Sequence, residues 1–162
     1  VPAFAASSTA LIGVRELLDD LIGLVPPPDE HPPVVGRAPG SDQEVEVRTD
    51  AAAPFVAQVF KTVSEAHVGD FSLLRVYAGR LQAGKEVQNF TRSQAEKLGS
   101  LYFLVGKERV EAKTVEAGDI VAAVKLKDSH TGDTLADKAR PVLMPELSIP
   151  GPLMADAARA RS

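Results

Sequence analysis

The chain has 162 residues, of which 44% are hydrophobic and 25% charged, so it is long enough for one compact domain with extensions and has an ordinary globular composition. It contains no run of about 18 apolar residues, so we expect neither a transmembrane segment nor a membrane partner. It also contains no cysteine, which excludes disulfides and thiolate metal sites and suits the cytosol.

The charge of the chain is unevenly distributed. The net charge is -4, which argues against a generally basic nucleic-acid binder, and we expect no DNA partner. Residues 55–140, however, hold 13 lysines and arginines against 11 aspartates and glutamates. The flanks are therefore acidic, and the middle of the chain is the part better suited to face an anion.

The first predicted element is an amphipathic helix at residues 14–25. Its apolar residues recur at spacings of three and four, at Val14, Leu17, Leu18, Leu21, Ile22 and Val25. Three prolines at 26–28 end this helix, because proline lacks the backbone donor. Prolines and glycines continue without a sustained period, so residues 29–54 are interpreted as an extended, semi-rigid linker.

From residue 55 the pattern changes to short β segments separated by glycine or polar turns. They are expected at 55–63, 71–78, 86–90, 98–105, 110–115 and 120–126. Strands spaced in this way, without helices between them, indicate an antiparallel barrel or sandwich. A barrel is favoured because closure removes exposed edges, so we expect a mainly β fold preceded by one amphipathic helix.

Three motifs carry a resemblance to a known family. Residues 68–81 read VGDFSLLRVYAGRL, residues 115–122 read VEAGDIVA, and residues 131–135 read TGDTL. In this order they resemble domain II of translation elongation factor G. The resemblance implies a closed antiparallel six-stranded β-barrel, the fold of that domain.

The resemblance also implies a division of the chain. Residues 1–28 resemble the C-terminal end of the family's G domain, residues 29–54 form a linker, and residues 55–145 form the domain II barrel. Residues 146–162, with the run Pro150-Gly151-Pro152, resemble the linker and start of domain III. The missing initiator Met favours a piece of a longer protein.

Residues 79–86 nearly match a phosphate-binding loop. The motif ends in Ser or Thr and opens a helix, whereas Glu86 would repel phosphate and a strand is expected to follow, so a turn between strands is the better interpretation. His31, His67 and His130 lie far apart, and no metal site is expected. Nothing in the sequence indicates catalysis by this chain.

Two groups of residues are candidate sites. By resemblance, Ser7 lies in the loop beside the guanine base, although a loop or cap role fits it equally well. Basic residues near predicted turns are candidates for contacts with ribosomal RNA phosphates or are plain surface charges; they are Arg80, Lys85, Arg92, Lys97, Lys107 and Arg109.

The function implied by the resemblance is that of a ribosome-associated translational GTPase in elongation, which moves tRNA and mRNA. Its partners would be small-subunit ribosomal RNA, its own G domain and domains III to V, in the cytoplasm. GTP and Mg²⁺ would belong to the full-length protein, whereas this chain lacks the phosphate loop and switch motifs and is expected to be inactive, without a cofactor of its own.

Several alternatives stay open. Residues 101–108 and 126–130 are closer to the elongation factor G-like paralogues than to the main factor. Ribosomal protection proteins and release factor 3 share the same barrel. A stand-alone β-barrel that binds a protein or oligonucleotide, unrelated to translation, is the alternative outside the family.

Overall fold

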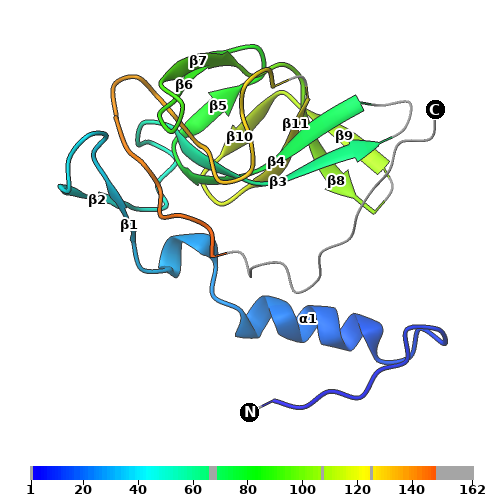
Figure 1. The fold of residues 1–162 in the computed structure, drawn as a ribbon. Helices are drawn as coiled ribbons and strands as arrows, with labels where there is room; N and C mark the ends of the chain where they lie inside the picture. The colour runs from blue at the N-terminus through cyan, green and yellow to red at the C-terminus, as the bar shows by residue number, and fades with distance from the viewer. Residues whose placement is uncertain (1, 66–68, 107, 125, 149–162) are drawn as a thin grey trace, which may run out of the picture.

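The computed structural model describes residues 2–65, 69–106, 108–124 and 126–148. Within these ranges the chain forms helices only before residue 31 and antiparallel strands thereafter (Figure 1). In chain order the elements are α1 (Val14–Leu24), the short 3-10 helix η1 (Pro28–Glu30), β1 (Val34–Arg37), β2 (Glu44–Val47), β3 (Val56–Glu65), β4 (Gly69–Ala78), β5 (Arg80–Gln82), β6 (Glu86–Asn89), β7 (Gln94–Lys97), β8 (Leu101–Val105), β9 (Glu108–Ala112), β10 (Thr114–Glu116), β11 (Ile120–Val124) and β12 (Thr134–Ala136). The mainly β fold with one preceding amphipathic helix is thus confirmed.

Helix α1 matches the element predicted at residues 14–25. It follows Gly13, which has a left-handed φ of 72°, and it ends where Val25 becomes extended ahead of the three prolines. None of its residues is buried, and Ile22 is 82% exposed. The helix lies apart from the main sheet (Figure 1), and it is too short and polar to cross a bilayer, as is every other helix in the described ranges.

The segment 29–54, expected to be an extended linker, contains a β-hairpin. Strands β1 and β2 pair antiparallel, with Val34 opposite Val47, and Gly40 in the connecting turn has a φ of 72°. The period-2 pattern of Glu44 to Val47 spans only four residues and is hidden among prolines, so the sequence pattern did not reveal it. Val47 is buried, which ties the hairpin to the rest of the domain.

The largest sheet has the strand order β7-β6-β12-β3-β4-β11-β8-β9, and all its pairs are antiparallel. Its centre is the long hairpin β3–β4, in which Val59 lies opposite Leu74 and the register shifts between Val59 and Lys61. The predicted segments 55–63, 71–78, 86–90 and 120–126 correspond to β3, β4, β6 and β11.

The prediction of a closed six-stranded barrel is wrong for the described residues. The eight-stranded sheet is open, with β7 and β9 at its two edges. The expected strand 110–115 breaks at Lys113 into β9 and β10, and β10 pairs with β5 in a separate two-stranded sheet. The expected strand 98–105 begins only at Leu101. Since no pairing joins β7 to β9 among the described residues, the hydrogen-bonded ring that a closed barrel requires is not complete.

Two apolar clusters lie on opposite faces of the central strands. The main core includes Leu74, Leu98, Leu101 and Leu135, each fully buried. A second cluster is formed by Val47, Val56, Ala78, Ala136, Val142 and Met144. The two clusters follow from the period of two along a strand, which sends neighbouring residues to opposite faces. Removing a core leucine from water contributes about 2 kcal/mol, so these clusters are a main source of the stability of the β domain.

Candidate nucleic-acid interface

The loop that resembles a phosphate-binding loop is a turn between strands, as predicted. Gly79 and Gly84 have φ angles of 75° and 83°, and Glu86 begins strand β6 rather than a helix. A Cβ atom at Gly79 would lie 2.5 Å from the backbone nitrogen of Phe55, so only glycine fits there. The carboxylate of Glu86 pairs with Lys138 Nζ at 2.7 Å. The turn therefore offers no anion cradle of the phosphate-loop type.

Two of the predicted RNA-facing residues, Lys85 and Lys97, lie on neighbouring, hydrogen-bonded segments of the backbone. The Leu98 amide donates to the carbonyl oxygen of Lys85 over 3.0 Å, and Lys97 lies opposite Glu86 in the β6–β7 register. Both lysines are exposed. Neither forms an ion pair with any other residue that the structure describes.

A third lysine joins these two. The amide of Ala83, in the same turn as Lys85, donates to the carbonyl oxygen of Lys113 over 3.1 Å. Lys113 is exposed at the break between β9 and β10. Lys113 was not among the predicted residues, because residues 110–115 were expected to form one uninterrupted strand. We call Lys85, Lys97 and Lys113 the lysine patch.

The predicted residue Arg80 is already paired. Its Nε atom lies 2.8 Å from Glu116 Oε2, across the β5–β10 pair, and both side chains are more than half exposed. An exposed pair of this kind contributes little free energy. It does neutralise the guanidinium locally, so Arg80 is a weaker phosphate ligand than the residues of the lysine patch.

Arg92 belongs to a partly buried polar network instead of an open surface. Its Nε atom lies 2.7 Å from Asp133 Oδ2, and the Asp133 side chain is only 4% exposed. Burial alone would raise the pKa of Asp133, but hydrogen bonds from Asn89, the backbone N–H of His130 and Arg92 outweigh it and hold the pKa below its ordinary value. Arg92 thus anchors the loop before β12.

A second buried carboxylate holds the same loop. Glu96 accepts hydrogen bonds from the amides of Lys127 and Asp128, at 3.0 and 3.1 Å, and from the hydroxyl of Ser129 at 3.0 Å. Because Glu96 is only 3% exposed, its carboxylate must be satisfied within the protein, and these hydrogen bonds stabilise the fold. No sequence signal indicated this arrangement, because the partners are about thirty residues apart.

The remaining predicted residues lie elsewhere. Arg109 stacks over Phe71 with its guanidinium carbon 4.9 Å from the ring centroid. Lys107 lies outside the described residues. Arg92 sits in the turn at one end of the β6–β7 hairpin, whereas Lys85 and Lys97 are at the other end. The five predicted residues that the structure describes therefore do not form one surface.

Ser7 lies in the loop before α1. Its backbone forms a β-bridge with Ile12, and its hydroxyl accepts a hydrogen bond from the Ala10 amide at 3.3 Å and lies 3.3 Å from the Thr9 hydroxyl. These contacts close the loop on itself. The described residues contain no group of three or more His, Asp or Glu arranged to hold a metal ion.

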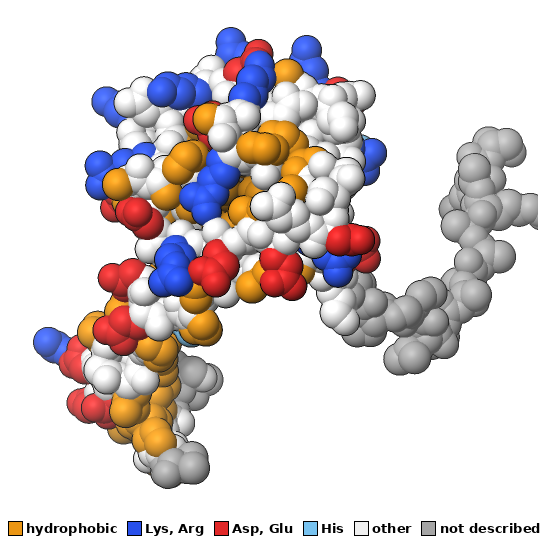
Figure 2. Space-filling view, turned by 90° about the vertical axis from the view of Figure 1, so that its left-hand side faces the viewer, with side chains coloured by type: hydrophobic (Ala, Val, Ile, Leu, Met, Phe, Trp, Pro, Cys, Tyr) orange, Lys and Arg blue, Asp and Glu red, His pale blue; other side chains and the backbone are white. Residues whose placement is uncertain are grey.

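Basic and acidic side chains are interspersed on the face shown in Figure 2. Lysine and arginine side chains are spread over the β domain, and acidic side chains lie among them as well as along its border with the N-terminal segment. The β domain with its exposed lysine patch is thus the part of the molecule that can meet a polyanion. These observations define a small antiparallel β domain with exposed basic side chains, in which the 79–86 turn is not a phosphate-binding loop.

The comparison with known families identifies this domain. Residues 54–138, more than half of the chain, match the family model described as Elongation factor G domain 2. The chain therefore belongs to that family and contains a domain related to translational GTPases. The three motifs at 68–81, 115–122 and 131–135 lie inside the matched region, so the resemblance they indicated is confirmed.

Proposed function

We propose that the chain is part of a ribosome-associated translational GTPase that acts in elongation, where it accompanies the movement of tRNA and mRNA. The observation that carries this proposal is the family match over residues 54–138. In this proposal residues 1–28 end a G domain, residues 29–54 connect it to the β domain at 55–145, and residues 146–162 lead toward domain III. GTP and Mg²⁺ are bound by the G domain of the full-length, cytoplasmic protein.

The β domain would dock on small-subunit ribosomal RNA through the lysine patch. The three exposed lysines come from adjacent backbone segments and form no ion pair with the residues that the structure describes. Each can therefore approach a phosphate without first breaking a bond to a carboxylate. Arg80 and Arg92 would have to give up Glu116 and Asp133 to do the same. The patch is therefore the better phosphate-binding surface, and base-specific readout is not required.

Related functions fit the same family. A ribosomal protection protein, a release factor 3-type GTPase or an elongation factor G-like paralogue would use the same β domain on the same particle. A stand-alone module unrelated to translation is not expected to bind ribosomes. Ribosome binding therefore separates the members of this family from the stand-alone module.

Sedimentation with purified ribosomal subunits tests the proposal. We expect the chain to pellet with small subunits in low salt and to remain in the supernatant with large subunits alone. Equal pelleting with both particles, or none with either, would contradict docking on the small subunit.

A further inference from the structure

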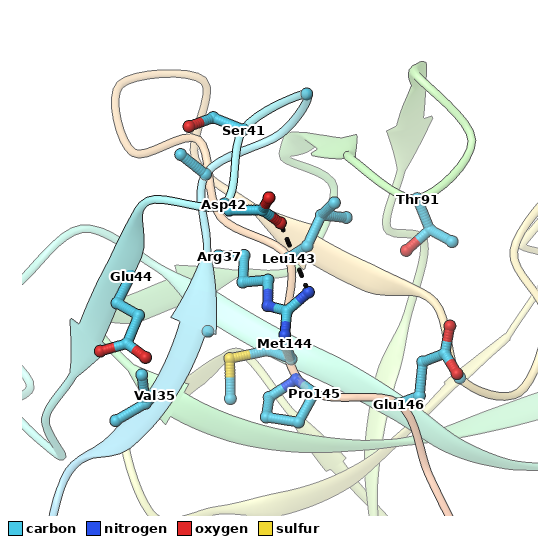
Figure 3. Close-up of a pocket in the computed structure, with 14 residues that line it drawn as sticks. Val35, Arg37, Ser41, Asp42, Glu44, Thr91, Leu143, Met144, Pro145 and Glu146 are labelled. Atoms are coloured by element: carbon cyan, nitrogen blue, oxygen red, sulfur yellow. Dashed lines mark ion pairs between the residues drawn. The ribbon is translucent and has the colours of Figure 1, made fainter.

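A groove of about 920 Å³ runs between the β1–β2 hairpin and the segment that follows β12. Thr91 and Gly132, from two other loops, complete its lining. Figure 3 shows Arg37 and Asp42 facing each other inside it, with Glu44 and Glu146 on opposite sides. The volume lies in the range of sites that hold a small ligand or a short peptide segment.

One wall of the groove is an incomplete strand pairing. Arg37 and Leu143 exchange both backbone hydrogen bonds, at 2.8 and 2.7 Å, as one isolated antiparallel bridge. Continued pairing would next join Val35 to Pro145. Proline has no amide hydrogen, and the carbonyl oxygen of Pro145 accepts from Gln58 Nε2 at 2.8 Å instead. The pairing therefore stops after one bridge.

This interruption leaves the backbone groups of Val35 without a strand partner on the groove side among the described residues. Strand β1 pairs with β2 on its other side, and apart from the single bridge to Leu143 no described residue pairs with it in the groove. Val35 is 45% exposed. An open strand edge of this kind can accept an extended chain through its backbone groups.

The charges that line the groove indicate which kind of extended chain could bind there. The groove contains three carboxylates, from Asp42, Glu44 and Glu146, and a single cation, Arg37. Arg37 pairs with Asp42 at 3.7 Å. Glu44 and Glu146 form no ion pair with any residue in the described ranges.

Apolar side chains line the groove between these charges, from Val35, Leu143, Met144 and Pro145. A strand that alternates cationic and apolar residues would complement both features, since its side chains point alternately to opposite faces.

We propose that this groove binds an extended segment of another protein that carries lysine or arginine residues. The segment adds a strand to the open edge of β1, its cations pair with Glu44 and Glu146, and its apolar residues contact Val35 and Met144. This inference goes beyond the proposed contact with RNA, because it uses a different surface of opposite charge and does not depend on the lysine patch.

Fluorescence anisotropy with a labelled peptide of alternating lysine and valine tests the proposal. The double variant Glu44→Gln/Glu146→Gln is expected to raise the dissociation constant roughly fivefold or more, as two exposed ion pairs are lost. The matched control is Glu108→Gln/Glu111→Gln on strand β9, which changes the net charge equally and is expected to leave the dissociation constant unchanged. A peptide of alternating glutamate and valine is expected not to bind.

Amide chemical shifts of the wild-type chain locate the binding. Addition of the lysine–valine peptide is expected to shift the amides of Val35, Thr91 and Gly132. The proposal would be overturned if both double variants weakened binding equally or if the glutamate peptide bound. It would also be overturned if the amide shifts were centred on α1 or β9, or if a short RNA displaced the peptide.

Discussion

Arg92 and Asp133 form a charged hydrogen bond of 2.7 Å between two turns that are 41 residues apart in the chain. The Asp133 carboxylate also accepts from Asn89 and from the His130 amide, so it joins the β6–β7 turn to the loop before β12. This pair distinguishes Arg92 from Arg80, although both arginines looked alike in the sequence.

The first prediction compares these two arginines. Arg92→Ala is expected to lower the free energy of unfolding by about 1–2 kcal/mol, because it removes a hydrogen bond to a nearly buried carboxylate. Arg80→Ala is expected to cost about 0.5 kcal/mol or less, because its partner Glu116 is exposed. Urea unfolding of both variants measures the difference, and equal costs would show that the Asp133 network does not depend on Arg92.

The second prediction concerns acid. The folded pKa of Asp133 lies below the ordinary value of 3.8, so its stabilising contribution is complete above that pH and is lost as the pH falls through the folded pKa. The part of the free energy of unfolding that Asp133 supplies is therefore expected to be complete above about pH 5 and to fall as the pH drops below about 4, through the folded pKa. Asp133→Asn is expected to show a smaller fall, and a fall as large as in the wild type would contradict the assignment.

The third prediction tests the turn at Gly79. Both Gly79 and Gly84 have positive φ, so alanine at either position costs about 1 kcal/mol of backbone strain. Only at Gly79 would the new Cβ also clash, 2.5 Å from Phe55 N, whereas nothing lies within 4 Å at Gly84. Gly79→Ala is therefore expected to lower the melting temperature clearly more than Gly84→Ala, and equal effects would mean that the chain around Phe55 moves aside.

The sequence predicted the elements whose signals are local. The spacing of apolar residues and the three prolines predicted helix α1 to within one residue at its end. The long segments rich in β-forming residues predicted β3, β4 and β11. The hairpin β1–β2 was missed because four alternating residues are too few to recognise among prolines. The break at Lys113 was missed because no glycine or proline marks it, and β10 after the break pairs with β5 outside the eight-stranded sheet.

The candidate site was predictable only in part. Lys85 and Lys97 were recognised because basic residues at turns are exposed by default. Lys113 joins them through a backbone contact with Ala83 that is thirty residues away in the chain. The partners of Arg92 and Glu96 depend on how the loop before β12 packs, which no local pattern encodes.

The fourth prediction concerns nucleotides. The chain is expected to bind GTP and GDP no better than background, because the Ser7 hydroxyl is engaged in its own loop and the 79–86 turn provides no phosphate cradle. Isothermal titration calorimetry checks this expectation. Saturable binding at micromolar nucleotide would require a site that these residues do not form.

The last prediction concerns the lysine patch, which is the central claim of the proposed function. Each phosphate that a lysine neutralises releases counterions, so the affinity of the chain for small ribosomal subunits is expected to fall as salt rises. Lys85→Ala/Lys97→Ala/Lys113→Ala is expected to weaken binding and to flatten this salt dependence. A control with the same change in net charge, Arg15→Ala/Lys61→Ala/Lys127→Ala, takes its residues from other elements and is expected to behave like the wild type.

The most direct measurement is the slope of the logarithm of the binding constant against the logarithm of the salt concentration, from about 50 to 200 mM. We expect the slope to decrease in magnitude by roughly 2–3 in the lysine-patch variant, about 0.7–0.9 for each lost phosphate contact, and to stay unchanged in the control. An unchanged slope in the lysine-patch variant, or an equal decrease in both variants, would contradict docking through the lysine patch.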